Sequence, residues 1–356
     1  MTPPVIAVEP VTDFAALAPV WRDLEQRADC SFFQSWAWTG CLAEERFAEP
    51  WLLTARRGDR VVGLALLNRG PRAGLTRPIL LGESGKPDLD SIFTEHNGLL
   101  LDRDEPDGLA ARCWAALAEK FGAARWLISG TPEATCAALP GERIARIRAK
   151  RPALYLDLSP DSDPLDGFSA NTRQQLRRSL RAWEAIGPLT LDVAAPGEAG
   201  GYLDALAELH QRYWTGRGKP GAFTQPFFGR FHHALLRRAA DRQSLDLIRI
   251  SAGERVAGYL YNFVHDGWVA AYQSGFDFGP DADRLRPGLV CHLMAIRHYR
   301  QAGMRRYDFL GGEARYKRSL AYAEIPLVWL DVRHKLPWQS RRQAVSSTQS
   351  PGQERG

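Results

Sequence analysis

The sequence lacks any run of about eighteen consecutive apolar residues, so it offers no segment typical of a membrane-spanning helix. Its opening stretch, MTPPVIAVEPVTDF, lacks the basic, apolar and small-residue order of a secretory signal. Three catalytic signatures are also missing: Gly-x-Ser-x-Gly, His-Glu-x-x-His and the Walker loop. These absences predict a cytoplasmic protein and argue against serine hydrolases, zinc proteases and P-loop enzymes.

Cysteine is scarce, and the five residues present are odd in number and scattered along the chain. No close pair exists that would clamp a metal ion or form a redox motif. His232 and His233 are adjacent, so on a helix they point about 100° apart and cannot chelate one ion in the usual way. We therefore expect no metal cofactor, and we expect most cysteines to be small buried residues.

With 356 residues, 45% hydrophobic and 24% charged, the chain has the composition of a globular protein large enough for two cores. The formal net charge of +5 would attract an anionic ligand such as a nucleotide cofactor, RNA or a membrane surface. A GC-rich genome that favours arginine explains the same excess. Composition does not separate these two readings.

A small module occurs twice in the sequence. Arg60-Val-Val-Gly63 and Arg255-Val-Ala-Gly258 each follow a polar turn inside a predicted hairpin. Further along each half, a helix end carrying Gly122 or Gly303 precedes a short apolar strand. The same order of elements in both halves favours a duplicated α/β domain over one large sheet.

The predicted elements divide the chain into an N-terminal domain (1–150), a C-terminal domain (151–335) and a disordered tail (336–356). The segment that begins at Arg151 is rich in Pro, Asp and Ser and is predicted to link the two domains. We expect helices at 13–28, 35–45, 107–121, 171–186, 201–213, 226–238 and 288–302, and strands at 51–56, 60–68, 98–101, 125–129, 245–251, 255–264, 267–276, 306–310 and 327–332.

The predicted helix at 171–186 carries arginines on one face. Asn171 followed by Gln174 is typical of a capping box and sets the expected start. Arg173, Arg177 and Arg181 recur every fourth residue, so they would repel one another unless an anion or a row of carboxylates lies opposite. A solvated surface is the alternative interpretation.

The segment at 268–302 contains the richest candidate for a ligand site. Pro287 and Gly288 open a predicted helix, and Arg284 and Arg286 stand just before them. Free N–H groups and the positive end of the helix dipole would hold a diphosphate there. A plain proline-initiated helix with solvated arginines is the alternative.

A series of motifs resembles one family. The series is Arg173-Gln-Gln-Leu-Arg-Arg178, Leu209-His210, Trp214, Arg217-Gly218, Gly221-Ala-Phe223, Tyr272-Gln-Ser-Gly-Phe-Asp277, Pro287-Gly288 and Asp308-Phe-Leu-Gly-Gly312 with Tyr316-Lys317. In this order they resemble the GNAT acyltransferases, and more closely the tandem-GNAT, BioF2-like or CelD-like family, relatives of the FemABX peptidyltransferases. The resemblance covers about residues 150–320, with a weaker match at Phe33-Gln-Ser-Trp36.

The resemblance implies an α/β (α+β) fold of tandem GNAT-like domains, each with a mixed, mostly antiparallel central sheet flanked by helices. It implies acetyl-CoA or another acyl-CoA as co-substrate. The general pyrophosphate signature is altered here, because Arg284-Leu-Arg-Pro-Gly288-Leu289 keeps the opening Arg and one shifted Gly. The residues expected to bind the cofactor are Tyr272, Ser274, Gly275, Arg284, Arg286, Gly288 and Leu289.

Three residues are candidates for the chemistry of acyl transfer to an amine. Asp308, at the carboxyl end of its strand, is the candidate base or amine anchor; alternatively it accepts backbone N–H bonds from Gly311 and Gly312. Tyr316 would protonate the leaving thiolate, and Lys317 would pair with a phosphate or an acceptor carboxylate. Ordinary surface packing is the alternative for both of these residues.

The acceptor pocket is expected to involve His210, Trp214, Arg217, Phe223 and Arg173, although a satisfied core histidine is the favoured interpretation of His210. We expect an N-acyltransferase whose acceptor is a small-molecule amine or an envelope or polysaccharide precursor, and not DNA. One alternative is a FemABX-like transferase that uses aminoacyl-tRNA, with the arginine helix contacting phosphates. Another is a catalytically silent GNAT-fold partner in polysaccharide biosynthesis.

Overall fold

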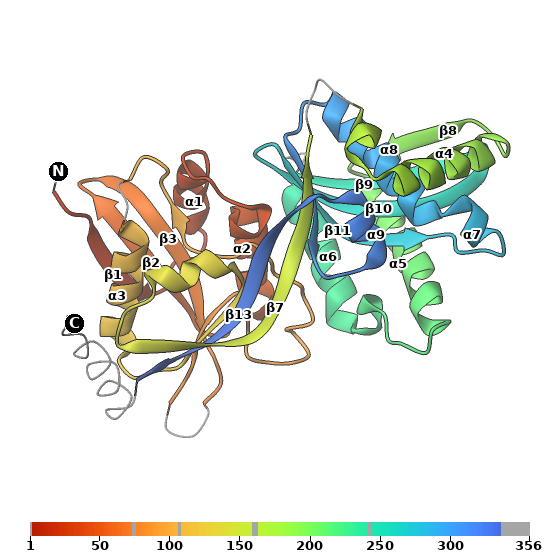
Figure 1. Ribbon diagram of the computed structural model, residues 1–356. Helices are drawn as coiled ribbons and strands as arrows, with labels where there is room; N and C mark the ends of the chain where they lie inside the picture. Colours follow the sequence, from red (N-terminus) through yellow and green to blue (C-terminus); the bar gives the residue numbers. More distant parts are fainter. Residues whose placement is uncertain (1, 73–75, 106–107, 159–162, 241–243, 336–356) are drawn as a thin grey trace, which may run out of the picture.

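The computed structural model describes residues 2–72, 76–105, 108–158, 163–240 and 244–335. The predicted tail, 336–356, lies outside the described residues. The chain forms two lobes side by side (Figure 1). The duplication expected from the sequence is present, but the described strands of both lobes join in one continuous 13-stranded sheet, which the sequence interpretation did not favour. Among the described residues, no helix combines the length and apolar character needed to cross a membrane.

The amino-terminal lobe, which runs up to β6, contains β1 (Val5–Pro10), α1 (Leu17–Glu25), α2 (Trp36–Arg46), β2 (Pro50–Arg57), β3 (Arg60–Arg69), β4 (Ile79–Leu81), β5 (Leu100–Leu101), α3 (Leu109–Phe121) and β6 (Trp126–Pro132). The carboxyl-terminal lobe, which runs from α4 to α9, contains α4 (Ala170–Glu184), β8 (Leu189–Val193), α5 (Ala199–Thr215), α6 (Pro226–Ala239), β9 (Leu245–Ala252), β10 (Arg255–His265), β11 (Trp268–Phe276), α7 (Ala282–Leu285), α8 (Pro287–Gln301), β12 (Arg306–Gly311) and α9 (Arg315–Leu320). The long strands β7 (Arg143–Asp157) and β13 (Ala323–His334) run between the lobes, and 3₁₀ turns include η1 (Phe32–Gln34) and η4 (Ala222–Thr224).

Both lobes use the same strand order, which confirms the tandem fold predicted from the repeated module. The strands run β1-β2-β3-β4-β6-β13 in one lobe and β8-β9-β10-β11-β12-β7 in the other. Pairing is antiparallel except for one parallel pair in each lobe, β4 with β6 and β11 with β12. Each predicted hairpin has a bulge just before its glycine, at Val62 before Gly63 and at Ala257 before Gly258.

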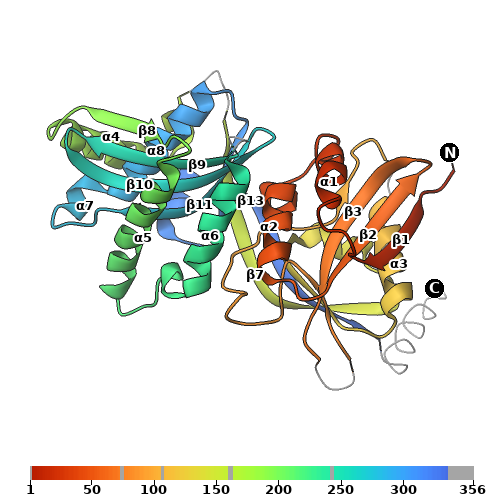
Figure 2. The same ribbon diagram turned by 180° about the vertical axis from the view of Figure 1, so that it is seen from behind.

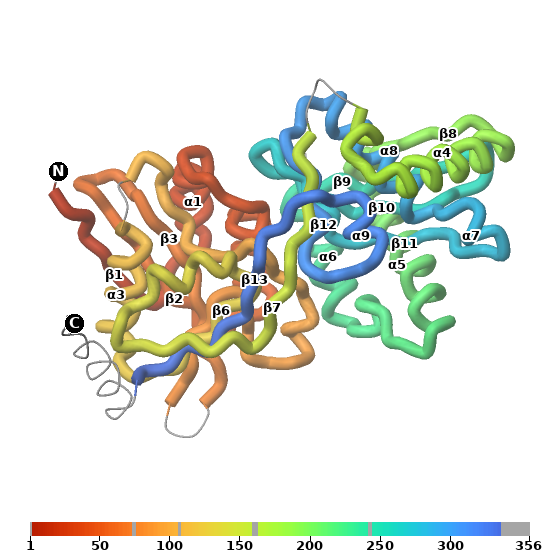
Figure 3. The backbone as a smooth tube through the Cα atoms, viewed as in Figure 1, coloured from red at the N-terminus to blue at the C-terminus, as the bar shows by residue number. Residues whose placement is uncertain are grey.

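The two lobes exchange their last strands. β7 follows the amino-terminal strands in sequence but pairs with β12, whereas β13 at the end of the described chain pairs with β6. β7 and β13 also pair with each other along their length and cross together from one lobe to the other (Figure 3). Pro152 faces Pro326 in this ladder. Because proline donates no N–H, these two residues give no backbone donor to the ladder between the lobes.

Helices cover both faces of each sheet. α4 and α8 pack on one face of the carboxyl-terminal sheet, and α5 and α6 pack on the other face (Figures 1 and 2). The amino-terminal sheet has α3 on one face and α1 with α2 on the other. α8 buries most of its circumference, including Val290, Leu293 and Ile296, as expected for a helix held between a sheet and a second helix.

An aromatic core joins the lobes where α2 meets α6 (Figure 2). The Trp38 ring of α2 lies 5.3 Å from the Phe231 ring of α6 and 5.8 Å from the Tyr272 ring of β11. These side chains are buried, so the lobes share one apolar core and are held in a defined arrangement.

The sequence-based element boundaries need four corrections. The linker expected from Arg151 is wrong as far as Asp157, because these residues belong to β7. The edge strands β1 and β8 were not predicted, and neither were the short elements β4, α7 and α9. The capping box at Asn171 is wrong, since Ser169 accepts the N–H of Thr172 and caps α4. The helix expected at 13–28 is the shorter α1. A domain boundary at residue 150 remains a prediction.

Candidate functional site

The sheet of the carboxyl-terminal lobe opens between its two parallel strands. β11 and β12 pair at three positions, from Trp268 opposite Arg306 to Ala270 opposite Asp308. Beyond Ala270, β11 continues to Phe276 in its ladder with β10, while β12 turns away. The Ser274 N–H donates to the side chain of its neighbour, the Gln273 Oε1 atom at 3.1 Å. Three of the expected cofactor contacts, Tyr272, Ser274 and Gly275, lie on this stretch of β11.

The first turn of α8 lies directly against the end of β11. A Cβ atom on Gly288 would lie 3.1 Å from the ring of Phe276, so glycine allows this close approach. The N–H groups of Leu289 and Val290 donate to the Arg286 carbonyl at 3.0 and 3.2 Å. Leu289 also directs its side chain into the core. The N–H and the side chain of Leu289 are thus both engaged within the protein. Of the two residues predicted to contact an anion on this turn, Gly288 is therefore the better placed to do so.

Two predicted arginines lie on the surface beside this turn. The side chain of Arg284 is 56% exposed, with an Asp281 oxygen at 4.0 Å, and Arg286 is exposed too. α4 packs against the same segment, because Ser179 Oγ donates to the Arg284 carbonyl at 3.2 Å. Arg173 lies near the start of α4 and donates to the Phe168 carbonyl at 2.5 Å. It is therefore separated from Arg284 by about two turns of helix.

Tyr316 lies close to this opening. Its ring stacks on His292 of α8, with centroids 5.1 Å apart and an interplanar angle of 13°, and the His292 ring lies 5.8 Å from Phe276. Burial raises the pKa of Tyr316 above its ordinary value, so the phenol keeps its proton at neutral pH. Burial lowers the pKa of His292 to about 3, and its Nδ1 atom lies 2.9 Å from the Tyr307 hydroxyl. Tyr316 thus has the protonation state of a general acid.

His210 fastens α5 to β11. Its Nδ1 atom lies 3.1 Å from the Ser274 carbonyl, and its Nε2 atom accepts the N–H of Ala222 at 3.3 Å. Burial lowers the pKa of His210, so the ring is neutral at neutral pH. A Cβ atom on Gly275 would come 2.3 Å from the Leu206 carbonyl of α5, so the two elements touch. Both ring nitrogens are satisfied, which matches the core-histidine interpretation.

The other predicted acceptor residues gather around His210. The Phe223 ring lies 5.5 Å from the His210 ring, and the Trp214 ring lies 6.1 Å from it. Arg217 is exposed and places its guanidinium 4.0 Å from the centre of the Tyr213 ring. These side chains form one surface group near the end of β11.

Tyr272 occupies a different place. Its hydroxyl accepts the N–H of Phe93 at 3.2 Å, and its ring stacks on Phe263 at 4.5 Å inside the aromatic core between the lobes. The side chain faces away from α8, so any contact of Tyr272 with a cofactor would be through its backbone.

Asp308 meets a histidine from the other lobe. Its Oδ2 atom lies 3.0 Å from Nε2 of His96, and both side chains are buried. Its Oδ1 atom accepts the N–H of Leu310 at 2.6 Å. Leu310 has a φ of 61°, in the left-handed region that non-glycine residues rarely adopt. The carboxylate therefore holds the turn that directs β12 away from β11. Gly311 and Gly312, the donors expected from the sequence, do not bind it.

The backbone after Asp308 is held by two further ionisable side chains. Glu95 of the amino-terminal lobe accepts the N–H of Gly311 at 2.5 Å. The Lys317 ammonium donates to the carbonyls of Phe309, Leu310 and Gly311 at 2.5, 3.2 and 2.9 Å. A phosphate or acceptor contact of Lys317, as predicted, would require it to leave these carbonyls.

These four groups form what we call the interlobe cluster: Glu95, His96, Asp308 and Lys317. Burial raises the pKa of Glu95 and lowers the pKa of Lys317. Burial also acts to lower the pKa of His96, but the negative charges of Asp308 and Glu95 outweigh it and the pKa is raised. Two acids thus face two bases in a site shielded from solvent.

Sequence reasoning missed Glu95 and His96, which lie in the long loop before β5. The available signal was the run Glu95-His96-Asn97, three polar side chains inside a loop flanked by apolar residues. His96 has a φ of 47°, which marks a constrained backbone.

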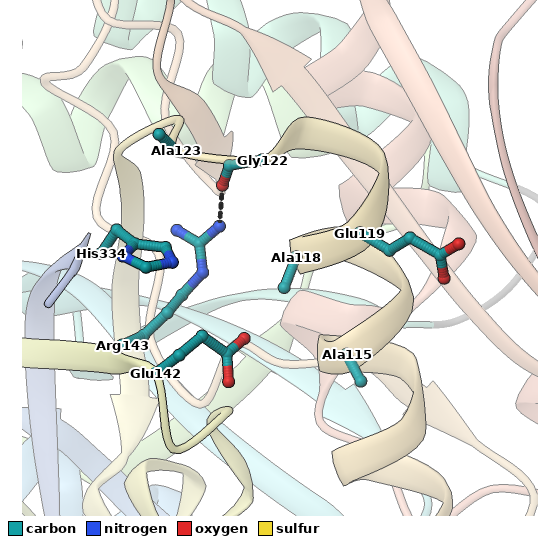
Figure 4. Close-up of a pocket in the computed structure, with 8 residues that line it drawn as sticks. All are labelled: Ala115, Ala118, Glu119, Gly122, Ala123, Glu142, Arg143 and His334. Carbon is teal, nitrogen blue, oxygen red and sulfur yellow. Dashed lines mark hydrogen bonds between the residues drawn. The ribbon is translucent and has the colours of Figure 1, made fainter. Parts of the chain in front are cut away.

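A separate cavity of about 440 Å³ lies in the amino-terminal lobe at the end of α3 (Figure 4). Arg143 donates to the carbonyls of Gly122 and Ala124, the latter at 2.8 Å, and its guanidinium lies 3.7 Å from the centre of the Trp126 ring. Arg143 therefore caps the carboxyl end of α3. In the described ranges, no group of three His, Cys, Asp or Glu side chains is placed to hold a metal ion.

The carboxyl-terminal lobe matches a known family. Residues 170–318 match the model of the acetyltransferase (GNAT) domain, a range that includes the β11–β12 opening, α8 and the Tyr316-Lys317 pair. No curated protein sequence matches the chain.

Several solved structures share the fold of the whole chain at low sequence identity. FemX has 10% identity and a TM-score of 0.60, covering 91% of this chain and 96% of FemX. The C-terminal domain of a putative lysylphosphatidylglycerol synthetase from Agrobacterium fabrum has 12% identity and a TM-score of 0.53, covering 94% and 96%. L-PGS from Bacillus licheniformis has 12% identity and a TM-score of 0.52, covering 92% and 95%. Residues 170–318 thus match the GNAT domain, and the two-lobed fold of the whole chain is shared with FemX and with the two other structures.

Proposed function

We propose that the protein is an N-acyltransferase that moves an acyl group from a CoA thioester to an amine. The observation that carries the proposal is the β11–β12 opening beside the first turn of α8, inside the segment that matches the GNAT domain. A helix start next to an unpaired strand edge offers both an anion site and backbone donors for a carbonyl.

In this proposal the thioester lies along β11 beyond Ala270. A backbone N–H of this edge polarises the thioester carbonyl, and Gln273 releases the Ser274 N–H to make room. The diphosphate of CoA binds at Gly288, with Arg284 and Arg286 neutralising its charge. The acceptor amine enters on the side of Trp214, Arg217 and Phe223.

The chemical step needs a proton for the departing thiolate. The neutral amine nitrogen attacks the carbonyl carbon, the C–S bond breaks, and the Tyr316 hydroxyl gives its proton to the sulfur. The proton that the nitrogen loses as the amide forms returns through water to the Tyr316 oxygen, so the phenol is restored. The stacking of Tyr316 on His292 fixes the ring near the end of β11. Asp308 contributes by holding the Leu310 turn, which keeps the two strands apart. No direct role in catalysis is assigned to Lys317, because its ammonium is bound by three carbonyls.

The test is calorimetric titration of the full chain with acetyl-CoA and longer acyl-CoAs. The proposal expects saturable binding that weakens at least about tenfold in an Arg284→Ala/Arg286→Ala double variant, because two phosphate contacts are lost. Arg305→Ala is the matched control, since this exposed arginine lies in the turn preceding β12 and pairs with Asp266. Failure of every acyl-CoA to bind at about millimolar concentration would contradict the proposal.

A second candidate is transfer of an aminoacyl group from tRNA, as the resemblance to FemABX proteins suggests. The packing of α4 against α7 favours this second candidate. It brings the exposed Arg177 and Arg181 of α4 near the exposed Arg284 of α7. Such a basic surface fits a phosphate backbone. Binding of tRNA that weakens steeply with salt, together with no binding of acyl-CoA, would favour this candidate.

A further inference from the structure

A cavity of about 340 Å³ lies in the carboxyl-terminal lobe, away from the proposed acyl site. It is enclosed by the ends of α6 and α8 and by the neighbouring ends of β8, β9 and β10. Most of its wall is apolar, including Leu236, Ala239, Leu245, Val264 and Met304. A volume of this size is within the range of small-molecule sites, roughly 300–1,000 Å³.

The cavity has one acidic group. The Asp246 carboxylate accepts a hydrogen bond from the Tyr299 hydroxyl at 2.7 Å, and that hydroxyl lies 3.2 Å from Nδ2 of Asn262, which donates to it. Asn262 is fully buried, and its Oδ1 atom has no partner in the described chain. This chain of hydrogen bonds fixes the carboxylate in one orientation.

The charge of Asp246 is poorly compensated. Burial raises its pKa, whereas the Tyr299 hydrogen bond and the charge of His298 act in the opposite direction. Within the described residues, Asp246 forms no ion pair with a lysine or arginine. A carboxylate in an apolar wall favours an incoming cation, because the cation restores the interactions lost with water.

The cavity is distant from the β11–β12 opening. His298, Tyr299 and Ala302 lie at the carboxyl end of α8, whereas the proposed diphosphate contact is at its first turn. At about 1.5 Å per residue, the 15 residues of α8 separate the two ends by roughly 20 Å. A ligand in this cavity would therefore not overlap an acyl-CoA at the opening.

We propose that this cavity binds a small organic ammonium ion with an apolar body. The ammonium group pairs with the Asp246 carboxylate, and the apolar body packs against Leu236, Val264 and Met304. This site is separate from the proposed acyl site and does not depend on the proposed function.

The experiment titrates the full chain with 2-phenylethylammonium and, as the matched uncharged probe, 2-phenylethanol. Binding is measured by calorimetry and by ligand-observed NMR. The proposal expects the ammonium ion to bind at least about tenfold more tightly than the alcohol, and the Asp246→Asn variant to lose this preference. Asp192→Asn is the control, because Asp192 lies on the neighbouring β8 and its side chain is 45% exposed.

A second variant keeps the test decisive if Asp246→Asn does not fold. Ala302 is exposed at the cavity wall, so Ala302→Phe is expected to fill the cavity and weaken ammonium binding about tenfold without disturbing the core. The affinity for acetyl-CoA, whatever its value in the wild type, should be unchanged in all these variants. Equal affinity for the two probes, no binding of the ammonium ion at about 10 mM, or binding unchanged by Ala302→Phe would overturn the proposal.

Discussion

His96 of the amino-terminal lobe and Asp308 of the carboxyl-terminal lobe form a buried ion pair, with Nε2 and Oδ2 3.0 Å apart. The same carboxylate holds the left-handed turn at Leu310, after which β12 leaves the sheet. One side chain thus takes part both in the contact between the lobes and in shaping the candidate acyl site.

Replacing Asp308 by Asn should destabilise the protein markedly. The variant removes one partner of a buried pair and leaves His96 without its counter-ion, which typically costs about 3–5 kcal/mol. The Asp192→Asn control should cost less than about 1 kcal/mol, because its partner Arg249 is on the surface. Urea unfolding measures both values, and similar losses for the two variants would contradict the role of Asp308.

The free energy of unfolding should fall as the pH rises above about 6.5. His96 has a raised pKa in the folded state, so the folded protein binds more protons than the unfolded chain above the unfolded value of about 6.5. The stabilisation is full below that pH and is lost as the pH rises through the folded pKa. Urea unfolding at several pH values should show this slope in the wild type.

The matched variant for this pH dependence is His96→Asn, because asparagine tolerates the φ of 47° better than most residues. Its slope between about pH 6.5 and 8.5 should be flatter than that of the wild type. A slope that is unchanged by the substitution would assign the pH dependence to another group.

The loop at 94–97 packs so closely on Gly130 of β6 that replacing this glycine should destabilise the protein. A Cβ atom on Gly130 would come 2.1 Å from the Thr94 carbonyl, and its φ is 58°. Gly58 has a similar φ of 59°, but nothing lies within 4 Å of its Cβ position. Gly58→Ala should therefore cost about 1–2 kcal/mol from backbone strain, and Gly130→Ala should cost clearly more. Equal costs in thermal unfolding would show that the loop yields easily.

Removing the Tyr316 hydroxyl should slow acyl transfer. Tyr316→Phe keeps the stacking on His292 but removes the proton donor, so kcat should fall about 10²-fold while the affinity for acyl-CoA is kept. Tyr322→Phe is the control, because Tyr322 is 56% exposed and donates to the Asp157 carbonyl. Steady-state kinetics with free thiol detection compares the two, and an equal kcat in both variants would remove Tyr316 from the mechanism.

Local sequence signals predicted the repeated part of each lobe. The turn around Gly58 and the one around Gly253 lie between apolar stretches, so both hairpins were readable from neighbouring residues. Pro287 likewise indicated the start of α8, because proline suits a first helical turn.

The exchange of β7 and β13 could not be read from the sequence. Each pairs with a strand of the other lobe, and no local signal identifies such a distant partner. Pro152 suggested a linker, although in the fold it faces Pro326 within the ladder.

The partner of Asp308 was hidden for a similar reason. The end of β12 was predicted as a place for a functional carboxylate, but His96 and Glu95 come from a loop of the other lobe. The role of Lys317 was hidden too, because its ammonium donates to three backbone carbonyls of the same turn.

Hydrogen–deuterium exchange with and without acetyl-CoA tests the central claim most directly. If the thioester lies in the β11–β12 opening, protection should appear at 271–276 on β11 and at 286–292 around the first turns of α8. The corresponding strands of the other lobe, β4 and β6, should exchange unchanged. Protection confined to β4 and β6, or no change anywhere at saturating acetyl-CoA, would contradict the account.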